Sequence, residues 1–374
     1  MTPFNKPYLT GKETKYIEEA VATGKISGNG VFTQKCQQFF EEQYGFKKAL
    51  LTTSCTDALE MAAILAGIEK DDEVIIPSYT FVSTALAFVR QGAKIVFADS
   101  YSDNPNIDAN KIEELITTKT KAIVVVHYAG VSCDMEKILE IAKKYNLIVI
   151  EDAAQAIDSF YTFSNGEKKA LGSIGDLAAF SFHETKNIIS GEGGMLAINN
   201  EKFIDRAEII WEKGTNRSSF FRGEVNKYGW VDTGSSFLPS EIISAFLWAQ
   251  LENLEDIQNK RKSIWDRYYE GLKDNPNFSL PKIPDFATNN AHMFYLVFKN
   301  LEDRMRMIKK LKENDILAVF HYLSLHKSDF YNEKHDGRIL KNSDHFEDCL
   351  LRLPFYYELQ EEEQRKIIEF LNTF

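Results

Sequence analysis

Between residues 47 and 182, short continuous apolar runs alternate with segments of helical periodicity, and this alternation restricts the fold more than any other feature. Runs such as 122–126 and 147–150 are apolar at every position rather than at every second one. Continuous runs are typical of strands that are buried on both faces, as in a parallel sheet covered by helices. The pattern therefore predicts an α/β fold with a mainly parallel central sheet and helices on both faces.

The individual elements follow from the same periodicity. In the first half of the chain we expect strands at 49–51, 73–76, 93–97, 122–126, 147–150 and 177–182, and helices at 11–23, from 32, 58–66, 82–90, 111–116 and 135–145. A long amphipathic helix at 240–257 should continue into a charged helix at 259–272, followed by strands at 294–298 and 318–321 and helices at 304–314 and from 361. We therefore expect a large domain, residues 1–255 with an N-terminal arm, and a smaller α+β domain, residues 256–374.

Composition narrows the functional classes. The 374 residues carry a formal net charge of −11, which argues against a nucleic acid partner but allows a local basic pocket. The four cysteines include no Cys-x-x-Cys pair, so we expect no metal site and a reducing cytoplasm. No apolar run approaches a membrane span, and the first residues lack the apolar core of a signal peptide. We expect a cytoplasmic protein with no membrane association.

One lysine stands out at the end of an expected strand. The run 177–182 ends in polar residues, presents Lys186 and then breaks into glycines at 191, 193 and 194. A lysine that is partly unprotonated can attack a carbonyl and form a Schiff base. The common alternative is an ordinary surface lysine in a turn, so a second signal is needed.

Asp152 provides that second signal, because it leaves the strand at 147–150 and enters the small residues Ala153 and Ala154. Small residues let a planar ligand approach, and an aspartate there could keep a pyridine nitrogen protonated, as pyridoxal phosphate requires. Metal ligation is the rival interpretation of Asp152, but no His, Asp or Glu cluster with ligand spacing accompanies it. Ligands of such sheets bind beyond the carboxyl ends of the strands, where both Asp152 and Lys186 are expected.

Two further strand ends carry weaker signals. Residues 54–57, Ser-Cys-Thr-Asp, begin a helix whose free N–H groups could bind a phosphate, although Ser54 or Thr56 could equally be only an N-cap. Tyr79 follows the next strand and could lie against a flat ring or simply pack in the core. An aspartate for a ring nitrogen, a helix start for a phosphate and a lysine for an aldehyde together favour pyridoxal 5′-phosphate.

These motifs resemble those of the DegT/DnrJ/EryC1/StrS family of sugar aminotransferases, over essentially the whole chain. The matching segments are 54–59, 77–81, 151–155 and 181–186 with 191–194. The resemblance implies the aspartate aminotransferase-like fold type I of pyridoxal phosphate-dependent transferases. It also implies that Lys186 binds the cofactor covalently and moves the proton, while Asp152 pairs with the ring nitrogen. The other cofactor residues that it implies are Cys55, Thr56, Asp57 and Ser181 at the phosphate, Tyr79 on the ring, Gln155 by the ring hydroxyl, His183, and Ser236 from a second subunit.

Further segments resemble one branch of this family, the dTDP-4-amino-4,6-dideoxygalactose transaminases. They are 3–5, 213–217, 220–223, 234–236 and 320–322. This resemblance implies transfer of the amino group of L-glutamate to C4 of dTDP-4-keto-6-deoxy-D-glucose, for lipopolysaccharide or another surface glycan. It also implies a homodimer with shared active sites. The substrate-binding residues that it implies are Lys213, Arg217, Phe221, Arg222, His321 and Tyr322.

The chain departs from the family pattern at two positions, and the motifs leave more than one function open. Cys55 replaces a family glycine, and Ser236 replaces an asparagine that reaches the partner's phosphate. Within enzymes, amination at C3 or of another nucleotide sugar would use the same motifs. A non-catalytic regulatory relative belongs to a different class, which Lys186 and Asp152 count against. A nicotinamide dehydrogenase is disfavoured because the chain has no Gly-x-Gly-x-x-Gly fingerprint. Family dehydratases carry histidine in place of the lysine, so Lys186 favours transamination.

Overall fold

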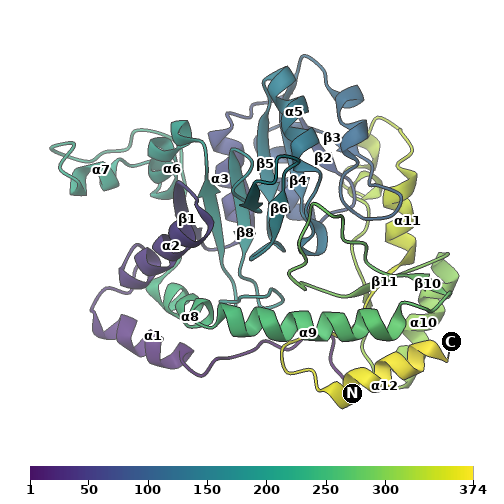
Figure 1. Ribbon diagram of the computed structural model, residues 1–374. Coiled ribbons are helices and arrows are strands. Elements are labelled where there is room, and N and C mark those ends of the chain that lie inside the picture. The colour runs from purple at the N-terminus through teal and green to yellow at the C-terminus, as the bar shows by residue number, and fades with distance from the viewer. Residues whose placement is uncertain (374) are drawn as a thin grey trace.

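The computed structural model describes residues 1–373 and contains a seven-stranded and a four-stranded sheet. The large sheet has the order β1-β9-β8-β5-β4-β2-β3 (Figure 1). Its strands are β1 Lys48–Thr52, β2 Glu73–Pro77, β3 Lys94–Ala98, β4 Thr120–Val126, β5 Ile148–Asp152, β8 Leu177–Ser181 and β9 Gly194–Ile198. A hairpin of β6 Phe160–Thr162 and β7 Lys168–Ala170 was not foreseen from the sequence.

The prediction of a mainly parallel sheet is confirmed. Strands β8, β5, β4, β2 and β3 pair in parallel, and β9 alone runs antiparallel to both of its neighbours, β1 and β8. Asp152 at the end of β5 is in register with Ala179 of β8. The chain segments that follow these two strands therefore begin side by side at the carboxyl edge of the sheet.

Helices cover both faces of this sheet because each central strand buries both of its faces. Within β4, Ile123 and Val125 belong to one core cluster, whereas Val124 belongs to the other. The first cluster includes side chains of α2 Val31–Tyr44, α5 Met135–Tyr145 and α8 Glu241–Leu251. The second includes side chains of α3 Cys55–Leu65, α4 Val82–Val89 and α6 Ile204–Trp211. Helix α1, Glu13–Ala22, packs on α8.

The smaller sheet is antiparallel throughout and has the order β10-β11-β13-β12. Its strands are β10 Phe278–Ser279, β11 Tyr295–Phe298, β12 Val319–Phe320 and β13 Leu350–Arg352. Apolar side chains of α9 Leu254–Leu272, α10 Leu301–Glu313 and α12 Glu361–Asn372 form a third core against this sheet. Helix α11, Lys341–Cys349, leads directly into β13. These elements match the predicted smaller α+β unit.

Helix α9 connects the two parts and runs beneath the large sheet from α8 towards α10 (Figure 1). The expected single helix at 240–257 is wrong, because α8 ends before Glu252 and α9 begins after Asn253. Asn253 leaves helical geometry and its side-chain amide donates to the carbonyl of Ala249. The predicted boundary at 255/256 falls in the first turn of α9 and stays a prediction. The first residues reach the smaller unit, since Thr2 pairs with Ile316 between α10 and β12.

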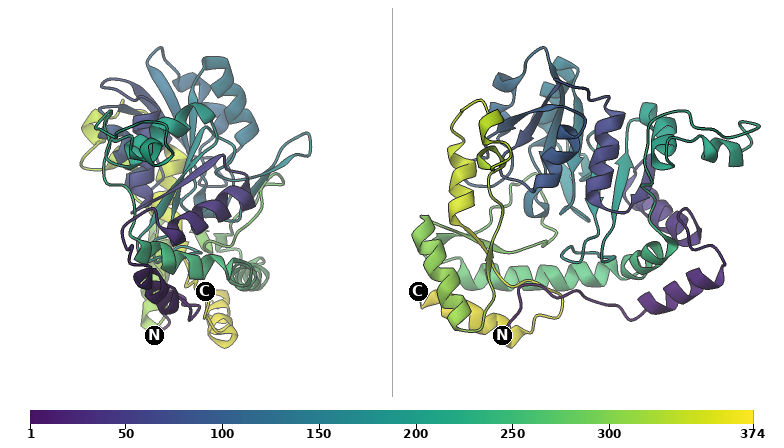
Figure 2. Two further views of the ribbon diagram at one scale, coloured as in Figure 1. Left: turned by 90° about the vertical axis from the view of Figure 1, so that its left-hand side faces the viewer. Right: turned by 180° about the vertical axis from the view of Figure 1, so that it is seen from behind.

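Two other segments do not form the regular helices or strands that the periodicity of apolar residues predicts. Residues 111–116 do not form one helix but parts of two short 3₁₀ turns, Ala109–Lys111 and Glu113–Leu115. Residues 211–236 form an arm that carries the short helix α7, Arg217–Phe221, and projects away from the sheet (Figures 1 and 2). None of the helices within residues 1–373 has the length and apolar character needed to cross a membrane.

Candidate active site

A cavity of about 770 Å³ lies at the carboxyl ends of β5 and β8. Small-molecule sites typically have volumes of roughly 300–1,000 Å³, so it has room for a cofactor and part of a substrate. Both parts of the chain contribute to its wall. The lining residues that matter below are Phe4, Cys55, Thr56, Phe81, Ser83, Asp152, Gln155, Ser181, His183, Lys186, His321, Tyr322 and Arg352.

Lys186 lies in this wall, in the loop that follows β8. Its backbone N–H donates to the carbonyl of His183 at 2.9 Å, which closes a tight turn and presents the side chain to the cavity. Burial lowers the pKa of the Lys186 amine, and the nearby Cys55 and Asp152 oppose this effect. The lowered pKa increases the fraction of neutral amine, which is the form that attacks a carbonyl.

Asp152 is buried and its carboxylate is held in a fixed orientation. One oxygen accepts a hydrogen bond from the Thr84 hydroxyl at 2.6 Å, and the other accepts from the Ala154 N–H at 3.1 Å. Burial raises the pKa of Asp152, while the hydrogen bonds from Thr84 and Ala154 lower it. A protonated ring nitrogen would supply the positive charge that favours the ionised carboxylate.

The start of α3 forms the third part of the site. The Ser54 hydroxyl accepts from the Asp57 N–H at 3.1 Å and so is the N-cap, as one of the two interpretations predicted. Within residues 1–373, however, the N–H groups of Cys55 and Thr56 have no protein acceptor. The hydroxyls of Thr56 and Ser83 lie 2.8 Å apart in the cavity wall. Free amides, hydroxyls and the helix dipole together suit a phosphate.

Gly194, the first residue of β9, packs closely against the backbone at the start of α3. A Cβ atom at residue 194 would lie 2.3 Å from the carbonyl carbon of Ser54 and 2.4 Å from the nitrogen of Cys55. Both contacts are with backbone, which cannot move aside without displacing the helix start. The glycine therefore lets β9 approach the amides that would hold the phosphate.

The opposite wall comes from the smaller unit. The Gln155 amide donates to the Tyr322 hydroxyl at 3.0 Å and accepts from the Ala129 N–H at 2.6 Å. The His321 ring stacks on that of Tyr322 with centroids 3.4 Å apart, and its Nδ1 lies 2.7 Å from the Tyr128 hydroxyl. Burial lowers the pKa of His321, so its ring is neutral. Gln155 and His321 thus both contact Tyr322 at the cavity, the first by a hydrogen bond and the second by ring stacking.

Two of the expected cofactor residues lie outside the cavity wall. Tyr79 does not face the cavity but is 1% exposed in an apolar cluster, where its hydroxyl donates to the carbonyl of His321. Phe81 lines the cavity instead and is 55% exposed, so its ring is available for a flat ligand. The Asp57 carboxylate accepts a hydrogen bond from the Thr53 hydroxyl and does not line the cavity. A carboxylate in the cavity wall would have repelled the phosphate. Ser181 and His183 do line the cavity.

The arm residues form a separate hollow. Lys213, Arg217, Phe221, Arg222 and Ser236 line a hollow of about 620 Å³ that includes Trp211 and does not contain Lys186. Arg222 is paired with Glu208 and Glu224, at 2.6 and 2.7 Å. One chain therefore does not bring the predicted basic and aromatic residues of the arm to its own cavity.

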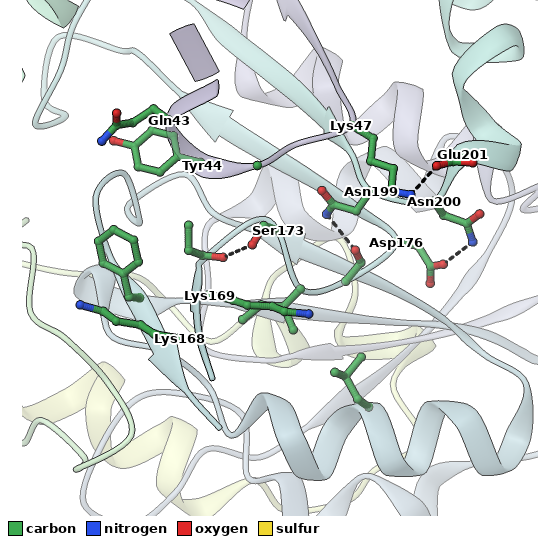
Figure 3. Close-up of a pocket in the computed structure, with 16 residues that line it drawn as sticks. Gln43, Tyr44, Lys47, Lys168, Lys169, Ser173, Asp176, Asn199, Asn200 and Glu201 are labelled. Atoms are coloured by element: carbon green, nitrogen blue, oxygen red, sulfur yellow. Dashed lines mark hydrogen bonds and ion pairs between the residues drawn. The ribbon is translucent and has the colours of Figure 1, made fainter. Parts of the chain in front are cut away.

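Another cavity of about 860 Å³, shown in Figure 3, lies at the amino ends of β5 and β8, where Asp176 immediately precedes β8. Its lysines have other partners: Lys47 is paired with Glu201, Lys169 lies 3.3 Å from Glu167, and Lys168 lies over the Phe160 ring. Ligands of parallel sheets bind at the other edge. The cavity at Lys186 is therefore the candidate active site. Residues 1–373 contain no group of three or more His, Cys, Asp or Glu that could hold a metal ion.

Sequence reasoning missed three residues of the site: Thr84, which orients Asp152, Phe81 and Arg352. Phe81 belongs to the recognised motif 77–81, but the sequence does not show which of its two aromatic rings, Tyr79 or Phe81, faces the cavity. Arg352 interrupts the apolar run 350–353, and a lone charge inside an apolar strand is a signal that could have found it.

The fold and this constellation define a pyridoxal phosphate-dependent transferase of fold type I. The chain matches the model of the DegT/DnrJ/EryC1/StrS aminotransferase family over residues 7–372 and belongs to that family. It is 32% identical to spore coat polysaccharide biosynthesis protein SpsC of Bacillus subtilis (strain 168), over 98% of this chain and 95% of that protein. It is also 32% identical to GDP-perosamine synthase of Escherichia coli O157:H7, over 100% of this chain and 98% of that enzyme.

Among solved structures, Spr1654 from Streptococcus pneumoniae in its PLP form shares the fold, with a TM-score of 0.89 and 24% identity over 99% of this chain and 97% of that one. Family membership confirms the predicted class of sugar aminotransferase. The cofactor prediction is confirmed as well: the cofactor is pyridoxal 5′-phosphate, and the residues at the cavity fit it.

Proposed function

We propose that this chain transfers the amino group of L-glutamate to C4 of dTDP-4-keto-6-deoxy-D-glucose and produces dTDP-4-amino-4,6-dideoxy-D-galactose. The observation that carries the transaminase chemistry is the meeting of Lys186, Asp152 and the start of α3 in one cavity. The choice of dTDP-sugar rests on the resemblance of segments such as 213–217 and 320–322 to that branch of the family.

The residues have distinct roles in this proposal. When bound, pyridoxal phosphate supplies an aldehyde that captures the donor's amine and a ring that withdraws electrons from the reacting carbon. Lys186 would hold the cofactor through its aldehyde and would move the proton at the reacting carbon. Asp152, oriented by Thr84, holds the proton on the ring nitrogen. The free amides of Cys55 and Thr56 hold the phosphate.

We further propose a homodimer in which the arm of each chain completes the partner's cavity. The arm carries exposed aromatic residues, since Phe221 is 70% and Trp230 is 85% exposed, and its basic residues lie away from Lys186 in the same chain. Exposed aromatic rings of this kind are typical of protein interfaces. Ser236 at the base of the arm would then reach the partner's cofactor phosphate.

Mixing two inactive variants tests the shared site. One chain carries Lys186→Ala and the other carries Arg217→Gln with Phe221→Ala. In a C2 dimer each mixed pair has one complete site, so an equal mixture should recover about a quarter of wild-type activity. A mixture that is no more active than its separate components would contradict the proposal.

GDP is the second candidate nucleotide, because a relative that matches the whole chain is named GDP-perosamine synthase. Amination at C3 would use the same residues on a different sugar carbon, whereas a non-catalytic regulatory protein would turn over no keto-sugar. The name of SpsC supports a role in surface polysaccharide synthesis, which we place in the cytoplasm.

Product analysis tests the substrate. The enzyme is incubated with glutamate and either dTDP-4-keto-6-deoxyglucose or a GDP-4-keto-6-deoxy sugar, and the product is examined by NMR. An axial amine at C4 of the dTDP-sugar, formed faster than any GDP product, is the expected result. A preference for GDP, an equatorial amine or an amine at C3 would each refute the proposed substrate or stereochemistry. No turnover of any keto-sugar would favour the regulatory role.

A further inference from the structure

His292 lines the cavity that contains Lys186 and is buried, with 6% of its surface exposed. It precedes β11, in a segment whose backbone is held by side chains from other elements. Arg261 of α9 donates to the carbonyls of Ala291 and His292, at 3.0 and 2.7 Å. Ala291 has a φ of +52°, which is uncommon for a residue with a Cβ atom. Strained backbone of this kind is concentrated at functional sites, where the surrounding structure fixes it.

The hydrogen bonds of Asn187 determine which nitrogen of the His292 ring carries the proton. The Asn187 amide nitrogen lies 2.9 Å from the carbonyl oxygen of Asn290 and 2.8 Å from Oε1 of Gln258. A backbone carbonyl only accepts, so this side of the Asn187 amide is the NH₂ group and the other side is the oxygen. That oxygen lies 2.8 Å from Nδ1 of His292. Nδ1 therefore carries a hydrogen and donates it to Asn187.

The other ring nitrogen of His292, Nε2, is an acceptor. Burial lowers the pKa of His292, and the positive charges of Lys186, Arg261 and Arg352 add to this effect, so the ring is neutral. No group within residues 1–373 donates to Nε2, and protein atoms do not enclose it. His292 therefore presents one free lone pair in the wall of the cavity.

The amine of Lys186 is the complementary group. It lies in the same wall, and among residues 1–373 it has no hydrogen-bond acceptor. Of the charges that act on His292, that of Lys186 is the strongest. Asn187, which orients the His292 ring, is the next residue in the chain. A free donor and a free acceptor thus lie close together, and the other titratable groups that act on the amine are Cys55, Asp152 and Arg352.

The neighbouring acceptors are less suited to this amine. The Asp152 carboxylate already has two donors and is assigned to the ring nitrogen of the cofactor. The Tyr322 hydroxyl already accepts an amide hydrogen. His321 is also buried in the wall, but its Nδ1 lies 2.7 Å from the Tyr128 hydroxyl, which can donate or accept. That contact does not determine where the His321 proton lies, whereas the proton of His292 is fixed.

We infer that Nε2 of His292 accepts a hydrogen bond from the Lys186 amine and stabilises its ammonium form, an inference that rests on the proposed transaminase function. In that function Lys186 takes up a proton at Nζ, and burial makes the resulting positive charge costly. A hydrogen bond from the ammonium to a neutral nitrogen offsets part of this cost. His292 is thus a positioning residue that acts through Lys186.

Two amide substitutions separate this role from a structural one. In His292→Asn, the amide nitrogen can take the place of Nδ1 and keep the hydrogen bond to Asn187, but no acceptor replaces Nε2. In His292→Gln, the longer side chain places its oxygen near the position of Nε2 and loses the hydrogen bond to Asn187. A structural role predicts more damage in His292→Gln, whereas the inferred role predicts more damage in His292→Asn. The matched control is His345→Asn, which lies on α11 outside the cavity.

The pH dependence of Lys186 labelling in the apoprotein tests the inference without turnover. Limited acetylation at a series of pH values, followed by peptide mass spectrometry, gives the pH at which half of Lys186 is reactive. The acceptor favours the ammonium, so His292→Asn should lower this midpoint by about one pH unit or more. His292→Gln and His345→Asn should keep the wild-type midpoint. Thermal melting by circular dichroism establishes that each variant is folded.

The cofactor-loaded enzyme provides a second readout. After mixing with glutamate alone, the change in cofactor absorbance should be about 10- to 150-fold slower in His292→Asn than in the wild type. In His292→Gln the loss should be much smaller, because the acceptor is kept. The His345→Asn control should react at the wild-type rate.

An unchanged labelling midpoint in His292→Asn, or a larger change in His292→Gln than in His292→Asn, would overturn the inference. If His292→Asn does not fold, nitrogen NMR of the wild-type protein labelled at histidine decides the question. A proton on Nδ1 alone supports the inference, whereas a proton on Nε2 excludes an acceptor there. The proposed function fails separately, if glutamate alone does not change the cofactor absorbance of the wild-type enzyme. The labelling midpoint reports on His292 in either case.

Discussion

Replacing Asp152 with asparagine separates the electronic role of this residue from its structural one. The amide oxygen can still accept from the Ala154 N–H, whose present distance is 3.1 Å. The new amide N–H can donate to the Thr84 hydroxyl, which would then donate to the Thr80 hydroxyl at 2.9 Å. The local hydrogen bonds are kept and a buried charge is removed, so the change in unfolding free energy should stay within about 1 kcal/mol.

The chemistry should suffer much more than the fold. Asparagine cannot hold a proton on the ring nitrogen, which removes a charge-assisted hydrogen bond of about 1.5–3 kcal/mol. Since each 1.36 kcal/mol of barrier corresponds to a factor of about ten, the donor half-reaction should slow by about 10- to 150-fold. Stopped-flow absorbance of the cofactor after mixing with glutamate alone measures this rate.

Asp176→Asn provides the matched control. Asp176 lies at the opposite end of β8, where its carboxylate accepts from the Val149 N–H and the Asn200 amide. This variant makes the same charge change but lies outside the cavity that contains Lys186, so it should react at the wild-type rate. An Asp152→Asn enzyme that binds cofactor and reacts at the wild-type rate would refute the assignment of Asp152 to the ring nitrogen.

Three further predictions concern the lysine and the phosphate subsite. Lys186→Ala should lose turnover and the absorbance of the lysine-bound cofactor while its circular dichroism stays native; normal transamination would exclude Lys186. Burial lowers the pKa of Lys186, so its neutral amine forms at a lower pH than in an ordinary lysine. The rate at which the apoprotein binds the cofactor should therefore rise with pH and level off below the ordinary lysine pKa of about 10.4. Capture that still accelerates through that pH would contradict the lowered pKa. Gly194→Ala should displace the start of α3 and weaken cofactor binding at least about tenfold in equilibrium titrations, since its Cβ would lie 2.4 Å from the Cys55 nitrogen. Gly229→Ala, with open space around it, is the control, and equal affinities for both variants would remove the steric argument.

The sequence was sufficient for six of the seven strands of the central sheet and for the strand ends that carry chemistry. Continuous apolar runs located β4 and β5 because strands buried on both faces have no polar alternation. Strands β9 and β13 were not found, because β9 follows directly on a glycine-rich turn and Arg352 interrupts the apolar run of β13. The break between α8 and α9 was missed because Glu252 and Asn253 do not interrupt the amphipathic pattern.

At the active site, the sequence could not predict the directions in which the side chains point. Tyr79 and Phe81 both follow β2, and only the packing of Tyr79 against Tyr128 and Phe346 shows which ring is left for the cavity. The role of Thr84 depends on a 2.6 Å contact with Asp152, 68 residues away in sequence, which no local pattern reveals.

The most direct test of the account is to locate the lysine that binds pyridoxal phosphate. Borohydride reduction makes the linkage between cofactor and lysine permanent, and peptide mass spectrometry then identifies the labelled residue. We expect the pyridoxyl mass on Lys186 and on no other lysine. A label on Lys47, Lys168 or Lys169, which line the cavity of Figure 3, would place the chemistry at the opposite edge of the sheet and contradict the assignment of the active site.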